Sequence, residues 1–208
     1  MRPFDDATRR NIAAACAAFT RLPENADPAS LKRAAVVVAL TRASDGGDTA
    51  FLLTRRASSL RAHRGQWALP GGRCDAGETP VEAALRELDE ELNLKLTAGE
   101  VLGLLDDYPT RSGYLITTVV VWAADGAAIR PNPGEVASVH RIALATIERA
   151  EAFDFVAIPE STRRVIRFHH HESLIHAPTA ALIYQFREVL AGRQTRVTDL
   201  EQPVFAWK

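Results

Sequence analysis

Apolar residues recur at intervals of three and four positions in several stretches of the chain, which is the pattern of a helix with one buried face. Strong boundary signals flank two of these stretches: an acidic cap at Asp5 or Asp6, and a stop at Gly192. Proline residues at 23 and 28 mark a linker after the first stretch. We expect helices over residues 5–21, 80–92, 142–149 and about 179–191.

Runs of apolar and β-branched residues predict strands over 34–42, 50–54, 101–106, 115–123 and 136–142. A Gly-Gly pair at 46–47 predicts a hairpin between the first two strands. The strands lie before and after a central helix without regular alternation, so they predict an α/β protein with a mixed sheet between helices. The expected organisation is an N-terminal helix and linker over 1–30, followed by one domain over 31–208.

The central helix has clear boundary chemistry and two distinct faces. Thr79 and Glu82 form a capping-box pattern, and Pro80 occupies the first helical position. Glu87, Glu90 and Glu91 fall together on one face of that helix. A neighbouring apolar stripe consists of Val81, Ala84, Leu85, Leu88 and Leu92.

Three stacked carboxylates without an interleaved lysine repel one another. A hard divalent cation would neutralise them, since Mg²⁺ and Mn²⁺ prefer carboxylate oxygens and bridge them to phosphates. The alternative is an acidic face that is simply solvated. Gly71, Gly72 and Gly77 precede the helix and allow the backbone a close approach or a sharp turn, which favours the first interpretation.

The spacing of this stretch resembles a known motif. From Gly72, five residues lead to Glu78 and seven more lead to Arg86, which begins the run Arg-Glu-Leu-Asp-Glu-Glu-Leu-Asn-Leu. This is similar to the Nudix box, and it departs from that motif only at Asn93, where the family has glycine. Asn is the next best residue for a left-handed helix end. The resemblance implies a Nudix-type α/β/α sandwich with a mixed β-sheet, preceded here by the N-terminal helix.

A basic stretch precedes the box. Arg55, Arg56, Arg61, His63 and Arg64 form a local electropositive wall that suits a phosphorylated substrate, although a solvated basic loop is the alternative. The spacing of residues 52–72 is similar to the signature of the coenzyme A diphosphatases of the Nudix superfamily, with Leu69 where that family usually has Phe. That resemblance implies hydrolysis of the coenzyme A diphosphate to 3′,5′-ADP and 4′-phosphopantetheine, or to acyl-phosphopantetheine from an acylated substrate.

The resemblance also implies site residues, with Mg²⁺ or Mn²⁺ as the cofactor. The metal would be held by Glu87, Glu90 and Glu91, and Arg86 would tie the loop through Glu78 while pointing away from the metal face. Glu90 is the favoured general base, and Glu135 in the turn-rich Pro-Asn-Pro-Gly-Glu-Val run is the other candidate. The expected substrate-binding residues are Arg55, Arg56, Arg61, Gly71 and Gly72.

Two other functions fit the same residues. One is a Nudix enzyme acting on an NDP-sugar, a dinucleotide or a nucleoside triphosphate; the other is a non-catalytic nucleotide-sensing domain, which usually has a degraded box. A net charge of −1 argues against a nucleic-acid partner. Without a long apolar run or a secretion signal, we expect a cytoplasmic protein with a small-molecule substrate and no membrane partner.

Two features have no assigned function from the sequence. The N-terminal helix is either a cover for the sheet or an element of a homodimer. Residues His169, His170 and His171 would point to alternate sides of a strand, so they are not expected to bind one ion together.

Overall fold

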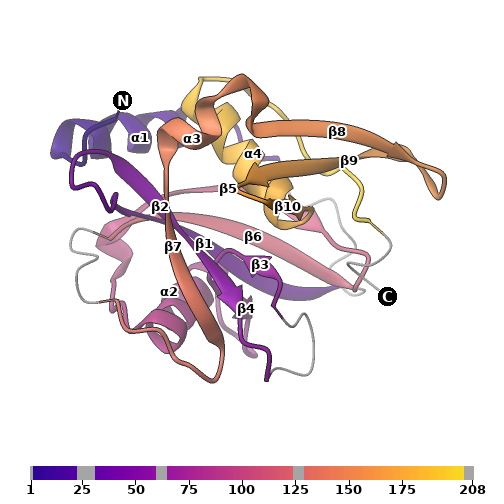
Figure 1. The fold of residues 1–208 in the computed structure, drawn as a ribbon. Coiled ribbons are helices and arrows are strands. Elements are labelled where there is room, and N and C mark those ends of the chain that lie inside the picture. The colour runs from indigo at the N-terminus through magenta and orange to yellow at the C-terminus, as the bar shows by residue number, and fades with distance from the viewer. Residues whose placement is uncertain (1, 23–30, 60–64, 124–128, 204–208) are drawn as a thin grey trace.

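The computed structural model describes residues 2–22, 31–59, 65–123 and 129–203, and within them a seven-stranded mixed sheet forms the centre of the molecule (Figure 1). The β1 and β6 strands run parallel, whereas the other paired strands are antiparallel. The order across the sheet is β3 (Trp67–Ala68), β2 (Thr49–Arg56), β1 (Lys32–Arg42), β6 (Tyr114–Trp122) and β5 (Val101–Pro109), with β4 (Gly71–Arg73) paired to β1 and β7 (Val136–Ala143) paired to β2.

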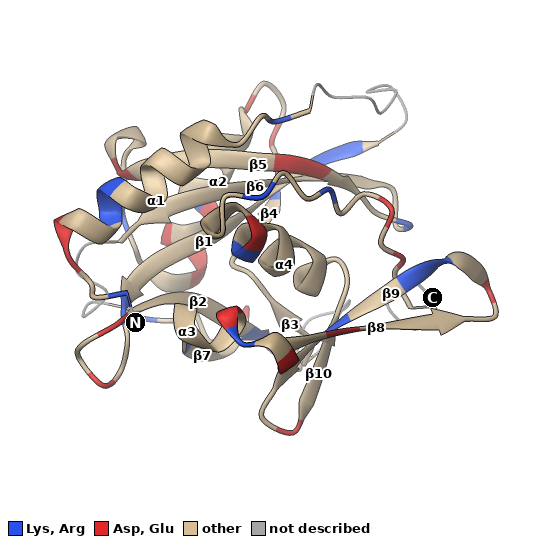
Figure 2. Cartoon of the chain, turned by 90° about the horizontal axis from the view of Figure 1, so that it is seen from above, with Lys and Arg blue, Asp and Glu red and all other residues tan. Residues whose placement is uncertain are grey.

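Helices cover both faces of this sheet. Helix α2 (Pro80–Leu92) lies below it in Figure 1, and α1 (Asp6–Ala18) and α4 (Thr179–Leu190) lie above it, where Figure 2 shows both across the upper face. Side chains alternate along β1 accordingly: Val37 packs in the α2 layer, and Val38 packs in the layer of α1 and α4. The α/β/α sandwich expected from the sequence is therefore confirmed.

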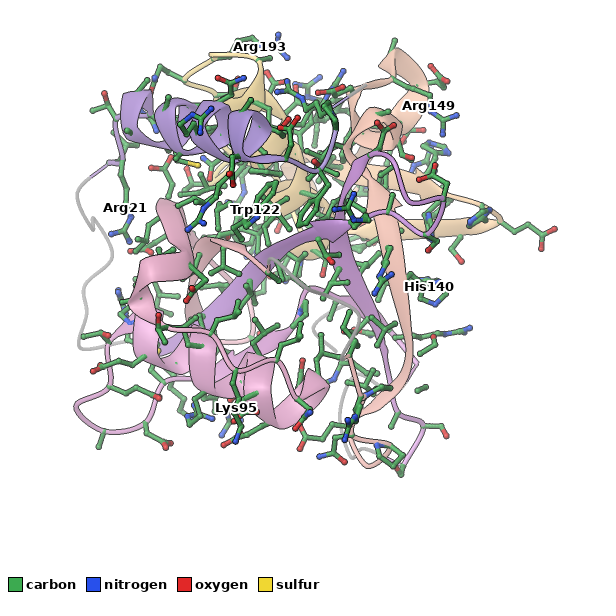
Figure 3. The ribbon with its side chains drawn as sticks, turned by 90° about the vertical axis from the view of Figure 1, so that its left-hand side faces the viewer. Arg21, Lys95, Trp122, His140, Arg149 and Arg193 are labelled. Atoms are coloured by element: carbon green, nitrogen blue, oxygen red, sulfur yellow. The ribbon has the colours of Figure 1, made fainter. Side chains whose placement is uncertain are left out.

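The N-terminal helix is part of this packing. Asp5 caps it by accepting a hydrogen bond from the backbone N–H of Thr8 at 2.7 Å. The helix lies so close to β5 that a Cβ added at Gly103 would come within 2.6 Å of the Cys16 Cβ. Nearby, Trp122 stacks on Phe4 with ring centroids 4.3 Å apart, among the packed side chains beneath α1 in Figure 3. The helix thus covers the sheet.

A second sheet of three antiparallel strands lies beside α4, and the sequence analysis did not predict it. Its strands are β8 (Phe153–Ile158), β9 (Ser161–His170) and β10 (Ser173–His176). His169 pairs with Asp154 at 3.1 Å on the outer side, while His170 is buried, so these neighbours do point to opposite sides of β9.

The predicted helices are all present: α2 has the expected bounds, and the other three are shorter than expected. The first ends at Ala18, before residue 21, and the short helix after β7 is α3 (Leu144–Glu148), followed by a 3₁₀ turn, η3 (Ala150–Ala152). Another 3₁₀ turn, η1 (Ala98–Glu100), leads into β5. Among the described helices, none has both the length and the apolar character that crossing a membrane requires.

Candidate active site

Helix α2 carries the candidate site, and its two ends are fixed by local chemistry. At the start, the Thr79 hydroxyl accepts from the Glu82 backbone N–H at 3.3 Å, and the Glu82 carboxylate accepts from the Thr79 N–H at 2.8 Å. At the end, Asn93 has φ 56°, and its N–H donates to the Asp89 carbonyl at 2.7 Å. The predicted capping box and the left-handed asparagine are both confirmed.

Three carboxylates converge at this helix. Oxygens of Glu87, Glu91 and Glu135 lie within 4.8 Å of one another. We call these three side chains the carboxylate group. Glu91 is only 3% exposed, and the other two are half-buried. An all-oxygen donor set of this kind fits a hard divalent cation such as Mg²⁺ or Mn²⁺.

Glu135 reaches the carboxylate group because its loop is bonded to the end of α2. The backbone N–H groups of Arg130 and Asn132 donate to the carbonyls of Leu92 and Glu91, at 2.9 and 2.8 Å. These carbonyls belong to the last turn of the helix, which leaves them without helical partners. The Asn132 amide then donates to the Glu135 carboxylate at 3.3 Å. The helix end thus positions a residue 44 positions after Glu91 in the sequence.

Burial makes two members of the carboxylate group, Glu87 and Glu91, costly to ionise. It raises the pKa of Glu91 to about 8, against the lowering effects of a hydrogen bond from the Gly71 N–H at 3.3 Å and of Arg56, whose Nη1 lies 3.9 Å away. Burial likewise raises the pKa of Glu87. A cation that compensates these charges would therefore be bound favourably, and the residues fit one.

The two glycines before the helix are required by this geometry. A Cβ at Gly72 would lie 2.2 Å from a carboxylate oxygen of Glu87, so glycine leaves room for that side chain. Gly71 has φ +146°, and a Cβ there would lie 2.2 Å from the backbone oxygen of Ala35. The predicted glycine loop therefore lies directly against the carboxylates of α2.

Arg86 forms ion pairs with three glutamates, and the expectation that it points away from the metal face was wrong. The guanidinium binds Glu78 as predicted, at 2.9 Å from Nε. It does not point away from the metal face, because its Nη1 donates to both Glu87 and Glu90 at 3.0 Å. Glu90 is 52% exposed and lies outside the carboxylate group, next to Glu87 across this shared nitrogen.

The expected apolar stripe of α2 packs against the core on its side of the sheet, and two further residues are buried with it. Val81 and Leu85 are only half-buried, while Ala83 is fully buried. Glu91 is buried as well, so the metal face and the packing face overlap.

The basic residues before the box take different positions. Arg56 approaches Glu91, and its Nε is buried without a hydrogen-bond partner among the described residues. Arg55 makes different contacts: its Nε donates to the Gly65 carbonyl at 3.1 Å, and its guanidinium lies 5.9 Å from the Trp67 ring centroid. The predicted substrate ligand Arg61, with His63 and Arg64, lies outside the described residues.

A cavity of about 450 Å³ opens beside the glycine loop, on the sheet face that α4 covers. Its lining includes Arg56 and Gly72, which adjoin Glu91 and Glu87, whereas no member of the carboxylate group itself lines the cavity. The sequence analysis did not find the cavity, because its walls come from segments far apart in the chain. The other walls include Val36, Trp67, Arg73, Tyr114, Ile116, Leu174, Ile175, Pro178 and Leu182.

Comparison with known proteins places the chain in one family. The NUDIX domain profile matches residues 31–161. A protein described as an uncharacterized Nudix hydrolase, NudL, from Photorhabdus laumondii is 34% identical over 141 residues, which cover 66% of this chain and 75% of that protein. Its namesake from Yersinia enterocolitica is 35% identical over 136 residues, 64% of this chain and 70% of the other.

A solved structure supports the same family assignment. The Nudix hydrolase RenU from M. smegmatis superposes with a TM-score of 0.51 and 26% identity, over 77% of this chain and 86% of that one. The profile, the relatives and the fold point to the same enzymatic chemistry, cleavage of pyrophosphate bonds in nucleoside diphosphate derivatives. The chain belongs to the Nudix hydrolase family.

Proposed function

We propose that the protein is a divalent-metal-dependent coenzyme A diphosphatase, which releases 3′,5′-ADP and 4′-phosphopantetheine from coenzyme A or the matching acyl product from a derivative. The observation that carries the proposal is Arg56. This residue belongs to the arginine signature before the box, it lines the cavity, and its buried Nε has no partner among the described residues. The Arg56 side chain as a whole is 29% exposed, so its guanidinium would meet a phosphate oxygen of the substrate through that exposed part.

The carboxylate group and Glu90 would hold Mg²⁺ or Mn²⁺. The ion, when bound, supplies positive charge for the diphosphate and for the attacking water. Arg56 contributes a second positive charge from the cavity side. The Gly71 and Gly72 backbone lets the diphosphate approach the carboxylates without a side chain in between.

Glu90 is our choice for the general base. It is the exposed carboxylate beside the group, and Arg86 orients it through the bond at 3.0 Å. Glu135 is the second candidate, since its loop brings it to the group from the other side. Arg86 is a positioning residue: it fixes Glu78, Glu87 and Glu90 relative to one another.

A substrate panel tests this proposal. kcat/KM should be measured with Mg²⁺ for coenzyme A, dephospho-coenzyme A, ADP-ribose, an NDP-sugar and a dinucleotide. The proposal predicts the highest value for coenzyme A or an acyl derivative. A higher value for ADP-ribose or for the NDP-sugar would replace it with another Nudix diphosphatase activity. Hydrolysis of no member would favour a nucleotide-sensing domain.

A further inference from the structure

One wall of the cavity is built by residues that follow the matched Nudix segment, which ends at 161. These residues come from β10, which belongs to the sheet that the sequence analysis missed, and from the start of α4, which it predicted. The wall is tied to the rest of the cavity, because the Thr179 hydroxyl donates to the Trp67 carbonyl at 3.3 Å. It consists of Leu174, Ile175, His176, Pro178 and Leu182, and we call these residues the C-terminal wall.

Leu174 is the notable member of the C-terminal wall, because it is 45% exposed. Within the described residues, Leu22 is the only other large apolar side chain that is exposed to a similar degree, at 42%. A single exposed leucine is ordinary on a protein surface. Leu174, however, lines the cavity that Arg56 and the glycine loop also line, whereas Leu22 does not. Its exposed surface is therefore available to a bound substrate.

The rest of the lining includes aliphatic surface that suits a saturated group. Val36 and Ile116 supply aliphatic surface from the central sheet. The aromatic residues of the lining already have partners: Trp67 makes edge contacts with His140 and His170, at centroid distances of 4.6 and 5.2 Å. The guanidinium of Arg73 lies 5.1 Å from the Tyr114 ring centroid. The apolar lining thus includes aliphatic surface from Val36, Ile116 and Leu174.

The position of the cavity indicates which part of a bound substrate would contact its aliphatic lining. Gly72 adjoins Glu87, and Arg56 approaches Glu91, so the cavity begins where the diphosphate is expected to bind. The group next to the diphosphate therefore enters the cavity. In coenzyme A, the side away from adenosine carries a saturated, branched carbon with two methyl groups at this point. ADP-ribose and dinucleotides carry a polar ribose there.

We propose that Leu174 is a specificity-determining residue, which contacts the branched, saturated group attached to the diphosphate and so favours coenzyme A over ribose-bearing substrates. This inference rests on the proposed function, and it deepens it. The C-terminal wall would then determine the substrate specificity of the enzyme, whereas the box would bind the metal. Since a ribose makes little use of an aliphatic surface, loss of Leu174 should affect the two substrate types differently.

The first test compares Leu174→Ser with Leu22→Ser as a matched control. Leu174→Ser should lower kcat/KM for coenzyme A about tenfold while leaving the value for ADP-ribose within about twofold. Leu22→Ser should change neither value, and Leu174→Met should restore the coenzyme A value because it restores apolar surface. Thermal unfolding of each variant checks that it folds. Equal losses on both substrates, or no loss on coenzyme A, would overturn the inference.

A second measurement does not need hydrolysis. Calorimetry with Mg²⁺ compares the binding of 4′-phosphopantetheine and ribose 5-phosphate to the wild type and to Leu174→Ser. The inference predicts that the variant loses about tenfold in affinity for 4′-phosphopantetheine alone. If that loss occurs but the wild type does not cleave coenzyme A, the proposed function is wrong, and Leu174 contacts the branched group without determining substrate specificity. If coenzyme A is cleaved but the affinities are unchanged, the inference is wrong and the function stands.

Discussion

The backbone N–H of Gly71 donates to the carboxylate of Glu91 at 3.3 Å, across 20 positions of sequence. This bond joins the glycine loop to the buried end of the box helix. It gives Glu91 a partner where burial raises its pKa to about 8 and would otherwise leave a costly isolated acid. The loop and the carboxylate group are consequently one structural unit, and the predictions below test its parts.

We predict that Glu90→Gln lowers kcat by at least about two to three orders of magnitude, because it removes a metal ligand or the general base while preserving side-chain size. Asp89→Asn is the matched control on the same helix. The Asp89 carboxylate forms a long ion pair with Lys95, at 3.9 Å, so this substitution should be nearly silent. Steady-state kinetics of both variants decide the matter, and an active Glu90→Gln enzyme would shift the chemistry to another residue.

Gly72→Ala should lower kcat about a hundredfold or more, since its Cβ would displace the Glu87 carboxylate that now lies 2.2 Å from that position. The displaced group is the end of a flexible side chain, so the melting temperature should change little. Gly47→Ala is the control, because nothing lies within 4 Å of a Cβ at that position. Normal kinetics in Gly72→Ala would mean that Glu87 is not held in place by the loop.

Arg61→Ala should reduce kcat/KM for coenzyme A about tenfold to a hundredfold and change the value for dephospho-coenzyme A little. The prediction comes from the arginine spacing in the sequence, which suggests that Arg61, with Arg56 nearby, reads the 3′-phosphate that dephospho-coenzyme A lacks. Measuring both substrates with both enzymes tests it. A loss of the same size on each substrate would assign Arg61 to holding the loop.

Acid stability should depend on Glu201, which is buried at the end of the described chain. Hydrogen bonds from Arg111 and Ser161 hold its pKa at about 2, below the usual 4.5. A lowered folded-state pKa stabilises the protein above about pH 4.5, and this contribution is lost as the pH falls towards 2.

Glu201→Gln should therefore destabilise the protein at pH 7 by about 1.5–3 kcal/mol. The difference from the wild type should shrink as the pH falls from 4.5 to 2. Denaturant unfolding across this range measures it. A difference that does not vary with pH would mean that the charge of Glu201 makes no contribution.

The box helix could be predicted closely because its signals are local. Thr79, Pro80 and Asn93 fix the helix by contacts within a few residues, and these contacts are visible in the sequence. The place of Glu135 in the carboxylate group depends on backbone bonds from Arg130 and Asn132 to the helix end. Such bonds leave no trace in side-chain pattern, so sequence reasoning reached Glu135 only through the resemblance.

The C-terminal sheet escaped prediction for a different reason. Arginines and histidines interrupt the apolar positions of β9, and the charged side chains pair within the sheet, as Arg167 does with Asp154. The pattern therefore resembles neither a buried strand nor a regular amphipathic one. The strands β3 and β4 contain two and three residues, too few for any periodicity. Without these elements the cavity could not be predicted.

The most direct measurement is a single-turnover reaction of the enzyme with coenzyme A and Mg²⁺, with the products identified by mass. Our account predicts 3′,5′-ADP and 4′-phosphopantetheine in equal amounts, and no reaction when the metal is chelated. Intact coenzyme A after prolonged incubation with an enzyme that cleaves ADP-ribose, or release of the 3′-phosphate in place of diphosphate cleavage, would contradict it.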